Sequence, residues 1–333
     1  MLRMDPFHLE RPATLEEALA LLAQHGAQAK VLAGGTDVVP NMKHGLHEPS
    51  VVVSIGRIGA LKGIVDVADE HGGALEIGAL TSLYDIEHSE VIRRRAPGLA
   101  RAAGLVAGPQ LRRMGTLGGN LCLDTRCLYY NQSYFWREAL GFCLKKDGTV
   151  CHVVAGGKKC VAAASNDTAT LLLCLDATVE LRSAAGARIV PLFEFFVADG
   201  IKNTVLSPGE LLVKVRVPHA RAGVRRLEGY AKLRHRESID FPLLSVGARF
   251  DVDSGNKIMV ARVVVSALGA RPNRLALDAL VGRALDDVVI DEVAALAFAK
   301  CTPLTNIADD PAWRRDMVPV YVKRAIRQAV PST

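Results

Sequence analysis

With 333 residues, half of them apolar and only 5% aromatic, the chain is long enough for two or three modules with aliphatic cores. Its net charge of +6 comes from short basic pairs beside acidic residues, which is typical of solvated surfaces and argues against nucleic-acid binding. Residues 1–12 carry charges, and no run of about 18 apolar residues follows, so we expect a cytoplasmic protein with reduced thiols and no membrane contact.

The first 56 residues predict a small α/β module. Thr14 is followed three residues later by a glutamate, which is a capping-box signal, and apolar residues then recur at helical spacing. A strand over 30–33 runs into the turn Gly34-Gly35-Thr36-Asp37, and residues 51–55 form a second strand. We therefore place a first boundary near residue 56.

Residues 57–218 predict a second module. Residues 75–78 alternate like a strand, helices begin near 83 and 97, and an apolar segment over 171–175 is expected to be buried. A hairpin is expected over 179–190, and the alternating strand 209–217 stops at Pro218.

The last module, residues 219–333, predicts an antiparallel strand pair over 245–250 and 258–265, followed by helices over 291–300 and 320–330. The whole chain is thus expected to be α+β with three parts.

Two glycine turns, Gly34-Gly35-Thr36 and Thr116-Leu117-Gly118-Gly119-Asn120, stand out. Glycines let backbone N–H groups approach a pyrophosphate, and a threonine hydroxyl adds a donor. Neither turn has the dinucleotide-binding pattern or the P-loop lysine, which argues against a Rossmann or ATP-hydrolysing protein. Either turn considered alone is more often a simple chain reversal.

Five of the seven cysteines lie between Cys122 and Cys160. Clustered thiols in an intracellular chain are better interpreted as metal ligands than as disulfides. Cys127, Cys143, Cys151 and Cys160 are at least eight residues apart, whereas structural zinc sites usually use tight pairs. The spacing favours an iron–sulfur cluster, with zinc as the alternative.

Taken together, these residues resemble the flavin subunits of the molybdenum hydroxylase family, nearly end to end. Residues 33–40 match the first pyrophosphate loop of that family and residues 109–120 match the second. Residues 230–234 with 240–241 are similar to the C-terminal segment that reaches the flavin ring, and 313–317 to the entry of the final helix.

The resemblance implies a two-subdomain FAD-binding fold of the PCMH/vanillyl-alcohol-oxidase type and a C-terminal domain like that of the carbon monoxide dehydrogenase flavoprotein. The residues that it implies for FAD binding are Ala33, Gly34, Gly35, Thr36, Asp37, Val106, Ala107, Thr116, Gly118, Gly119, Asn120, Asp167, Leu212, Lys232 and Phe241. Among them, Lys232 is expected at the edge of the flavin ring, Phe241 near its face, and Leu212 in the same pocket.

An insert at about 124–162 separates the second turn from Asp167 and contains four of the cysteines. Such an insert resembles that of the 4-hydroxybenzoyl-CoA reductase β subunit, which carries a [4Fe-4S] cluster. Ligation by Cys127, Cys143, Cys151 and Cys160 is therefore implied, while Cys122, Cys174 and Cys301 are expected to be buried and unligated.

The resemblance implies an electron-transfer subunit without substrate chemistry of its own, and no Ser-His-Asp arrangement or carboxylate pair stands out. The resemblance implies a molybdenum-cofactor large subunit, a [2Fe-2S] small subunit, an (αβγ)2 assembly and a ferredoxin donor. Three functions remain open: a reductase of the 4-hydroxybenzoyl-CoA type, an oxidative hydroxylase of another aromatic or heterocycle, and a zinc-stapled nucleotide-binding protein.

Overall fold

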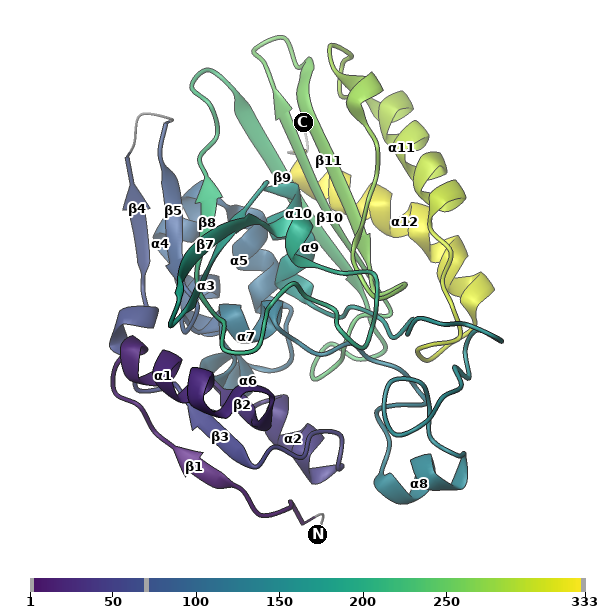
Figure 1. The fold of residues 1–333 in the computed structure, drawn as a ribbon. Helices are drawn as coiled ribbons and strands as arrows, with labels where there is room; N and C mark the ends of the chain where they lie inside the picture. Colours follow the sequence, from purple (N-terminus) through teal and green to yellow (C-terminus); the bar gives the residue numbers. More distant parts are fainter. Residues whose placement is uncertain (1–2, 69–71, 331–333) are drawn as a thin grey trace.

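The computed structural model describes residues 3–68 and 72–330, and these form three β-sheets with helices packed around them (Figure 1). This is the α+β arrangement expected from the sequence. Within the described residues, no helix is long and apolar enough to cross a membrane.

The N-terminal part is a parallel sheet with strand order β1-β3-β2. Its elements are β1 (His8–Glu10), α1 (Leu15–His25), a 3₁₀ turn (Gly26–Gln28), β2 (Ala29–Leu32), α2 (Val38–Lys43) and β3 (Val51–Ser54). The predicted capping box is present, since the Thr14 hydroxyl accepts a hydrogen bond from the N–H of Glu17 and the Glu17 carboxylate accepts one from the N–H of Thr14. The apolar side of α1 packs on β3.

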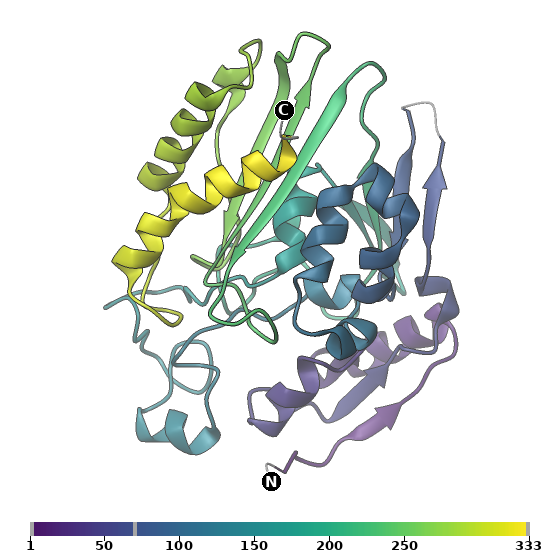
Figure 2. The same cartoon turned by 180° about the vertical axis from the view of Figure 1, so that it is seen from behind.

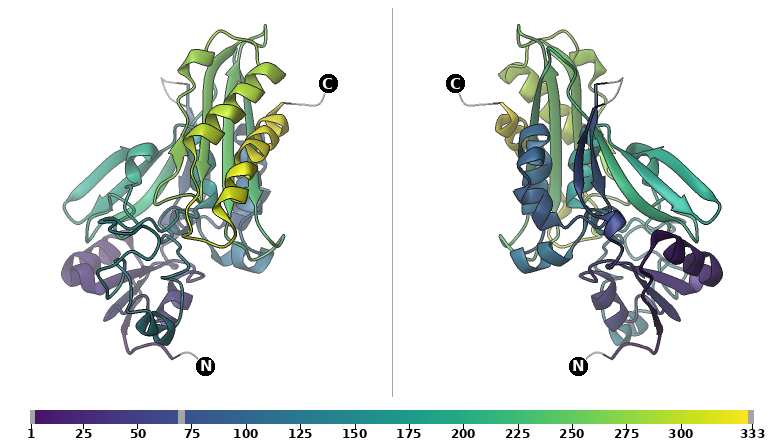
Figure 3. Two further views of the ribbon diagram at one scale, coloured as in Figure 1. Left: turned by 90° about the vertical axis from the view of Figure 1, so that its right-hand side faces the viewer. Right: turned by 90° about the vertical axis from the view of Figure 1, so that its left-hand side faces the viewer.

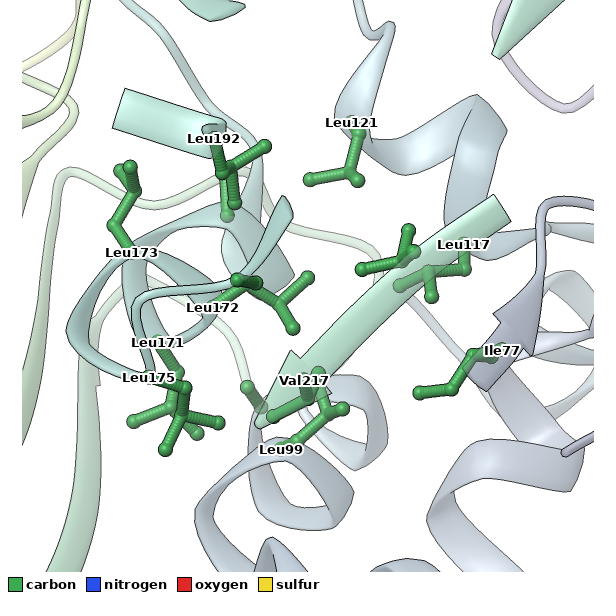
Figure 4. Close-up of a cluster of buried hydrophobic side chains, with 14 of the residues drawn as sticks. Ile77, Leu99, Leu117, Leu121, Leu171, Leu172, Leu173, Leu175, Leu192 and Val217 are labelled. Atoms are coloured by element: carbon green, nitrogen blue, oxygen red, sulfur yellow. The ribbon is translucent and has the colours of Figure 1, made fainter. Parts of the chain in front are cut away.

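The middle part is an antiparallel sheet with strand order β4-β5-β8-β6-β7. Its strands are β4 (Ile64–Val67), β5 (Ala74–Gly78), β6 (Thr178–Ser183), β7 (Gly186–Pro191) and β8 (Leu211–Pro218). Its helices are the 3₁₀ turn Gly59–Leu61, α3 (Leu83–His88), α4 (Glu90–Arg95), α5 (Pro97–Gly104), α6 (Pro109–Met114), α7 (Leu117–Leu121), α9 (Asp167–Cys174) and α10 (Leu192–Phe195). Leucines from α5, α7 and α9 meet Ile77 of β5 and Val217 of β8 in one buried cluster (Figure 4).

The C-terminal part is a second antiparallel sheet, with strand order β12-β11-β10-β9. Its elements are β9 (Arg225–Leu233), β10 (Leu244–Val252), β11 (Ile258–Ser266), β12 (Asn273–Arg274), the 3₁₀ turn Asp278–Leu280, α11 (Asp287–Lys300) and α12 (Pro311–Ala329). Helix α12 crosses β9 and β10 and packs against α11, whereas α5 and α9 approach the sheet from the middle part (Figure 2). This placement joins the middle and C-terminal parts through α9.

The cysteine insert lies between α7 and α9 and contains one short helix, α8 (Tyr134–Ala139). In the side views it lies at the same end of the molecule as the N-terminal part (Figure 3). The fully buried Arg137 donates from Nη2 to the Gly45 carbonyl at 2.9 Å, which fastens the insert to the N-terminal part.

The apolar segment 171–175 is buried, as expected, and residues 171–174 form the C-terminal half of α9. One expectation about the last helix differs from the structure. The last helix begins at Pro311 instead of residue 320, because Asp310 caps it and proline is compatible with the first helical position.

Candidate functional site

A cavity of about 810 Å³ opens where the three parts of the chain meet. Both glycine turns line it, together with residues from the β8 region and from the loop between β9 and β10. The sequence-predicted residues that line it are Ala33, Gly34, Gly35, Thr36, Asp37, Val106, Ala107, Thr116, Gly118, Gly119, Asn120, Asp167, Leu212 and Phe241. Lys232 is the one predicted cofactor residue outside this lining.

The first turn presents free donors to the cavity. In the described part of the chain, the N–H groups of Gly34, Gly35 and Thr36 have no protein acceptor. A Cβ atom on Gly34 would lie 1.7 Å from the Met114 carbonyl oxygen, so glycine is required where the two turns touch. Unpartnered amides in a concave turn are suited to an anionic group such as a pyrophosphate.

The second turn differs from the sequence expectation that its amides face the same anion. The N–H groups of Leu117, Gly118 and Gly119 donate to Thr81 O (3.0 Å), Ala79 O (2.8 Å) and Thr116 Oγ1 (3.2 Å). These bonds hold the start of α7 against the turn that precedes α3. The second turn therefore contributes the Thr116 hydroxyl and a glycine surface without side chains to the wall of the cavity.

Lys232 acts on the cavity through Asp167. Its Nζ lies 3.0 Å from Asp167 Oδ2 and donates to the Leu105 carbonyl at 3.1 Å, and the Tyr230 hydroxyl donates to Asp167 Oδ1 at 2.6 Å. Burial raises the pKa of Asp167, while Lys232 and Tyr230 oppose that shift. Because Asp167 lines the cavity and compensates the ammonium, the positive charge at this edge is largely neutralised.

Sequence reasoning missed a charged cluster at the same cavity, formed by Lys30, His47, Asp124 and Lys145. Lys145 Nζ lies 2.6 Å from Asp124 Oδ1 and His47 Nε2 lies 3.9 Å from Asp124 Oδ2. Burial and the nearby Lys30 lower the pKa of His47 to about 4, so the imidazole is neutral at pH 7. Lys30 could have been noticed, since it lies in the strand that leads into the first turn.

The other three widely spaced cysteines interact electrostatically with Cys127. Burial raises the pKa of Cys127 to about 11, and Cys160, Cys143 and Cys151 act in the same direction through their charge. The Cys160 sulfur also accepts from the Ala162 N–H at 3.4 Å. Nevertheless, within residues 3–68 and 72–330, no three His, Cys, Asp or Glu side chains are close enough to hold a single metal ion.

Cys122 corrects one expectation, because it is exposed and lines the cavity instead of being buried. Its exposure is to the interior of the cavity, where the surrounding protein raises the pKa of its thiol to about 12. Cys174 and Cys301 are buried, as expected.

Comparison with known proteins identifies the fold. Residues 5–220 match the family "FAD binding domain in molybdopterin dehydrogenase", and residues 229–329 match the "CO dehydrogenase flavoprotein C-terminal domain". The expected fold class, an FAD-binding domain of the PCMH type followed by this C-terminal domain, is thereby confirmed.

Relatives of known activity match over most of the chain. The carbon monoxide dehydrogenase medium chain of Afipia carboxidovorans is 30% identical over 325 residues, which cover 97% of this chain and 96% of the relative. The aldehyde oxidoreductase FAD-binding subunit of Escherichia coli is 35% identical over 269 residues, which cover 78% and 82%.

A solved structure agrees with these matches. Carbon monoxide dehydrogenase from Hydrogenophaga pseudoflava aligns with a TM-score of 0.78 and 28% identity over 98% of both chains. The chain therefore belongs to the FAD-binding medium subunits of the molybdenum hydroxylase family, and it is an oxidoreductase subunit.

Proposed function

We propose that this protein carries electrons between an FAD in the cavity and a [4Fe-4S] cluster in the insert, within a molybdenum-containing enzyme. Bound flavin exchanges one or two electrons, and the protein sets its potential through the charges and dipoles around it. The observation that carries the proposal is the cavity lined by both glycine turns, from whose wall Arg126 leads directly into the cysteine insert.

The residues that line the cavity take separate roles in this proposal. The free amides of Gly34, Gly35 and Thr36, with the Thr116 hydroxyl, bind the pyrophosphate. Asp167, whose carboxylate forms an ion pair with Lys232, lies beside the flavin. We retain the division into 1–56, 57–218 and 219–333, with the C-terminal part closing the cavity through its β9–β10 loop.

Cluster ligation is assigned to Cys127, Cys143, Cys151 and Cys160. Gly200 supports this assignment, since a Cβ atom there would lie 2.7 Å from the Cys160 sulfur and would restrict the space around the thiol. The N–H of Ala162, which donates to the same sulfur, is the kind of hydrogen bond that tunes a cluster's potential.

The proposed partners follow from the relatives. A carbon monoxide dehydrogenase medium chain is one chain of a larger enzyme, and one solved relative is described as a Cu,Mo-CO dehydrogenase. We propose a molybdenum-cofactor large subunit, a [2Fe-2S] small subunit, an (αβγ)2 assembly and a ferredoxin as external partner. The cytoplasm, whose reducing conditions keep thiols available for ligation, is the proposed location.

Two substrate classes follow. The cysteine insert favours a reductase of the 4-hydroxybenzoyl-CoA type, in which a low-potential donor drives reductive dehydroxylation. The names of the relatives, which include carbon monoxide, aldehyde and nicotinate dehydrogenases or oxidoreductases, favour an oxidative enzyme. The nicotinate relative fits the alternative of a hydroxylase acting on another aromatic or heterocyclic compound.

The test is to purify the complex anaerobically with its native partner subunits and to assay both directions. Reduced ferredoxin with 4-hydroxybenzoyl-CoA tests the reductive reaction, and an artificial acceptor with aromatic, heterocyclic and aldehyde substrates tests the oxidative one. Activity only in the second assay would overturn the reductive assignment. Purification without a molybdenum subunit would overturn the proposed assembly.

A further inference from the structure

The two ends of the cysteine insert are bridged by one residue pair that lies beside the cavity. The N–H of Arg126 donates to Ala163 O at 2.8 Å, and the N–H of Ala163 donates to Arg126 O at 2.7 Å. Arg126 directly precedes Cys127, and its side chain lines the cavity. We call this pair the neck of the insert.

The Arg126 guanidinium contacts two other parts of the chain from the neck. Nη2 forms an ion pair with Asp37 Oδ1 at the first glycine turn, and Asp37 Oδ2 accepts from Asn41 Nδ2 at 3.0 Å. The guanidinium carbon also lies 4.0 Å from the centre of the Phe241 ring, in the loop between β9 and β10. Asp37 and Phe241 both line the cavity, although they lie far apart in the sequence.

We propose that Arg126 is a positioning residue that fixes the flavin pocket and the cysteine insert relative to each other. A planar guanidinium can pair with a carboxylate and stack on an aromatic ring at the same time, which a lysine ammonium does less well. Through these contacts, the neck, the first turn and the Phe241 loop are held in one arrangement. The inference rests on the flavin half of the proposed function and does not require the cluster.

Loss of the guanidinium has a defined electrostatic consequence. Asp37 follows Thr36 directly, so its carboxylate lies beside the proposed pyrophosphate position. Without Arg126, that carboxylate would repel the anionic ligand, and Phe241 would lose its stacking partner. Both effects weaken FAD binding, and the first is relieved when Asp37 becomes an amide.

The test measures FAD dissociation constants of flavin-stripped full-length protein by quenching of flavin fluorescence, together with the flavin potential and the iron content. Arg126→Ala should raise the dissociation constant about tenfold or more, since it leaves the partly buried Asp37 carboxylate without its cationic partner. Arg126→Lys should lie between wild type and Arg126→Ala, and Arg126→Ala combined with Asp37→Asn should bind FAD better than Arg126→Ala alone.

Arg315→Ala is the matched control, because Arg315 also stacks on an aromatic ring, Phe298 at 4.5 Å, and it does not line the cavity. Phe241→Ala, which leaves the ion pair intact, should weaken FAD binding less than Arg126→Ala does, and it remains informative if Arg126→Ala fails to fold. Wild-type affinity and potential in Arg126→Ala or in Phe241→Ala, or no recovery in the double variant, would overturn the inference. FAD binding without iron in the wild type would overturn only the cluster.

Discussion

A methyl group on Gly34 should force the two glycine turns apart. The Cβ of an alanine there would lie 1.7 Å from the oxygen and 2.5 Å from the carbonyl carbon of Met114, whereas real Cβ contacts essentially never fall below 3.0 Å. Both obstructing atoms belong to the backbone, so no side-chain rotation can relieve the clash. The turns would have to separate by more than about 1 Å, beyond the roughly 0.5 Å within which a binding site must be held.

The expected magnitude follows from this displacement. Overpacking of this kind costs about 1–3 kcal/mol of stability, and a shift of about 1 Å in a binding site can weaken its function by roughly a hundredfold. The assay is FAD titration of the flavin-stripped Gly34→Ala protein, with urea unfolding in parallel. Alanine at Gly119 should have a smaller effect, since its Cβ would meet only Thr116 Oγ1, at 3.0 Å.

Gly59→Ala is the matched control, because nothing lies within 4 Å of the added atom. It should change stability by no more than about 0.5 kcal/mol and should leave FAD binding unchanged. A Gly34→Ala protein that binds FAD with wild-type affinity would refute the conclusion that contact between the two turns shapes the cavity.

Three further changes test other parts of the account. Lys232→Ala should lower the free energy of unfolding, measured with urea, by about 3–5 kcal/mol, because it leaves the buried Asp167 carboxylate without its cationic partner. The flavin potential of this variant should also shift, since Lys232 acts on the cavity through Asp167. Burial raises the pKa of Glu228 from 4.5 to about 7, so stability should fall by roughly 3 kcal/mol as pH rises from about 4.5 to about 7. Glu228→Gln should flatten that dependence in urea unfolding series. Cys143→Ser should lose iron in metal analysis before it loses FAD, because the two sites use different residues.

Controls make these results decisive. Lys214→Ala removes a partly exposed ion pair with Glu76, worth about 0.2–1 kcal/mol, so an equal loss in Lys232→Ala would contradict the buried-pair argument. Cys174→Ser should keep its iron, and equal iron loss in both cysteine variants would contradict the ligand assignment. If the free energy of unfolding rose with pH in this window, and Glu228→Gln removed that rise, the assigned pKa shift of Glu228 would be contradicted.

Signals within a few residues of each other predicted much of the fold. The capping box at Thr14 and the alternation that ends at Pro218 located elements whose stability depends on their own sequence. The last helix was placed too late because Asp310 and Pro311, which start it, precede the apolar segment that the periodicity detected.

The cavity was predictable where glycines mark it, and not where distant residues meet. The occupied amides of the second turn follow from contacts with Ala79 and Thr81, about 40 residues earlier in the chain. Arg126 reaches Asp37 and Phe241 across 89 and more residues, and no local pattern distinguishes it from a surface arginine. Cys122 was expected to be buried because the family that the sequence resembles places small packing residues at this position, yet it lies where the chain borders the cavity.

The cofactor content of the wild-type protein, purified without oxygen, tests the central claim most directly. FAD quantified after denaturation, iron and sulfide analysis, and EPR of the reduced protein together report both proposed groups. The account predicts about one FAD and about four iron atoms per chain, with the EPR signal of a reduced iron–sulfur cluster. Stoichiometric FAD without iron, or zinc in place of iron, would contradict it.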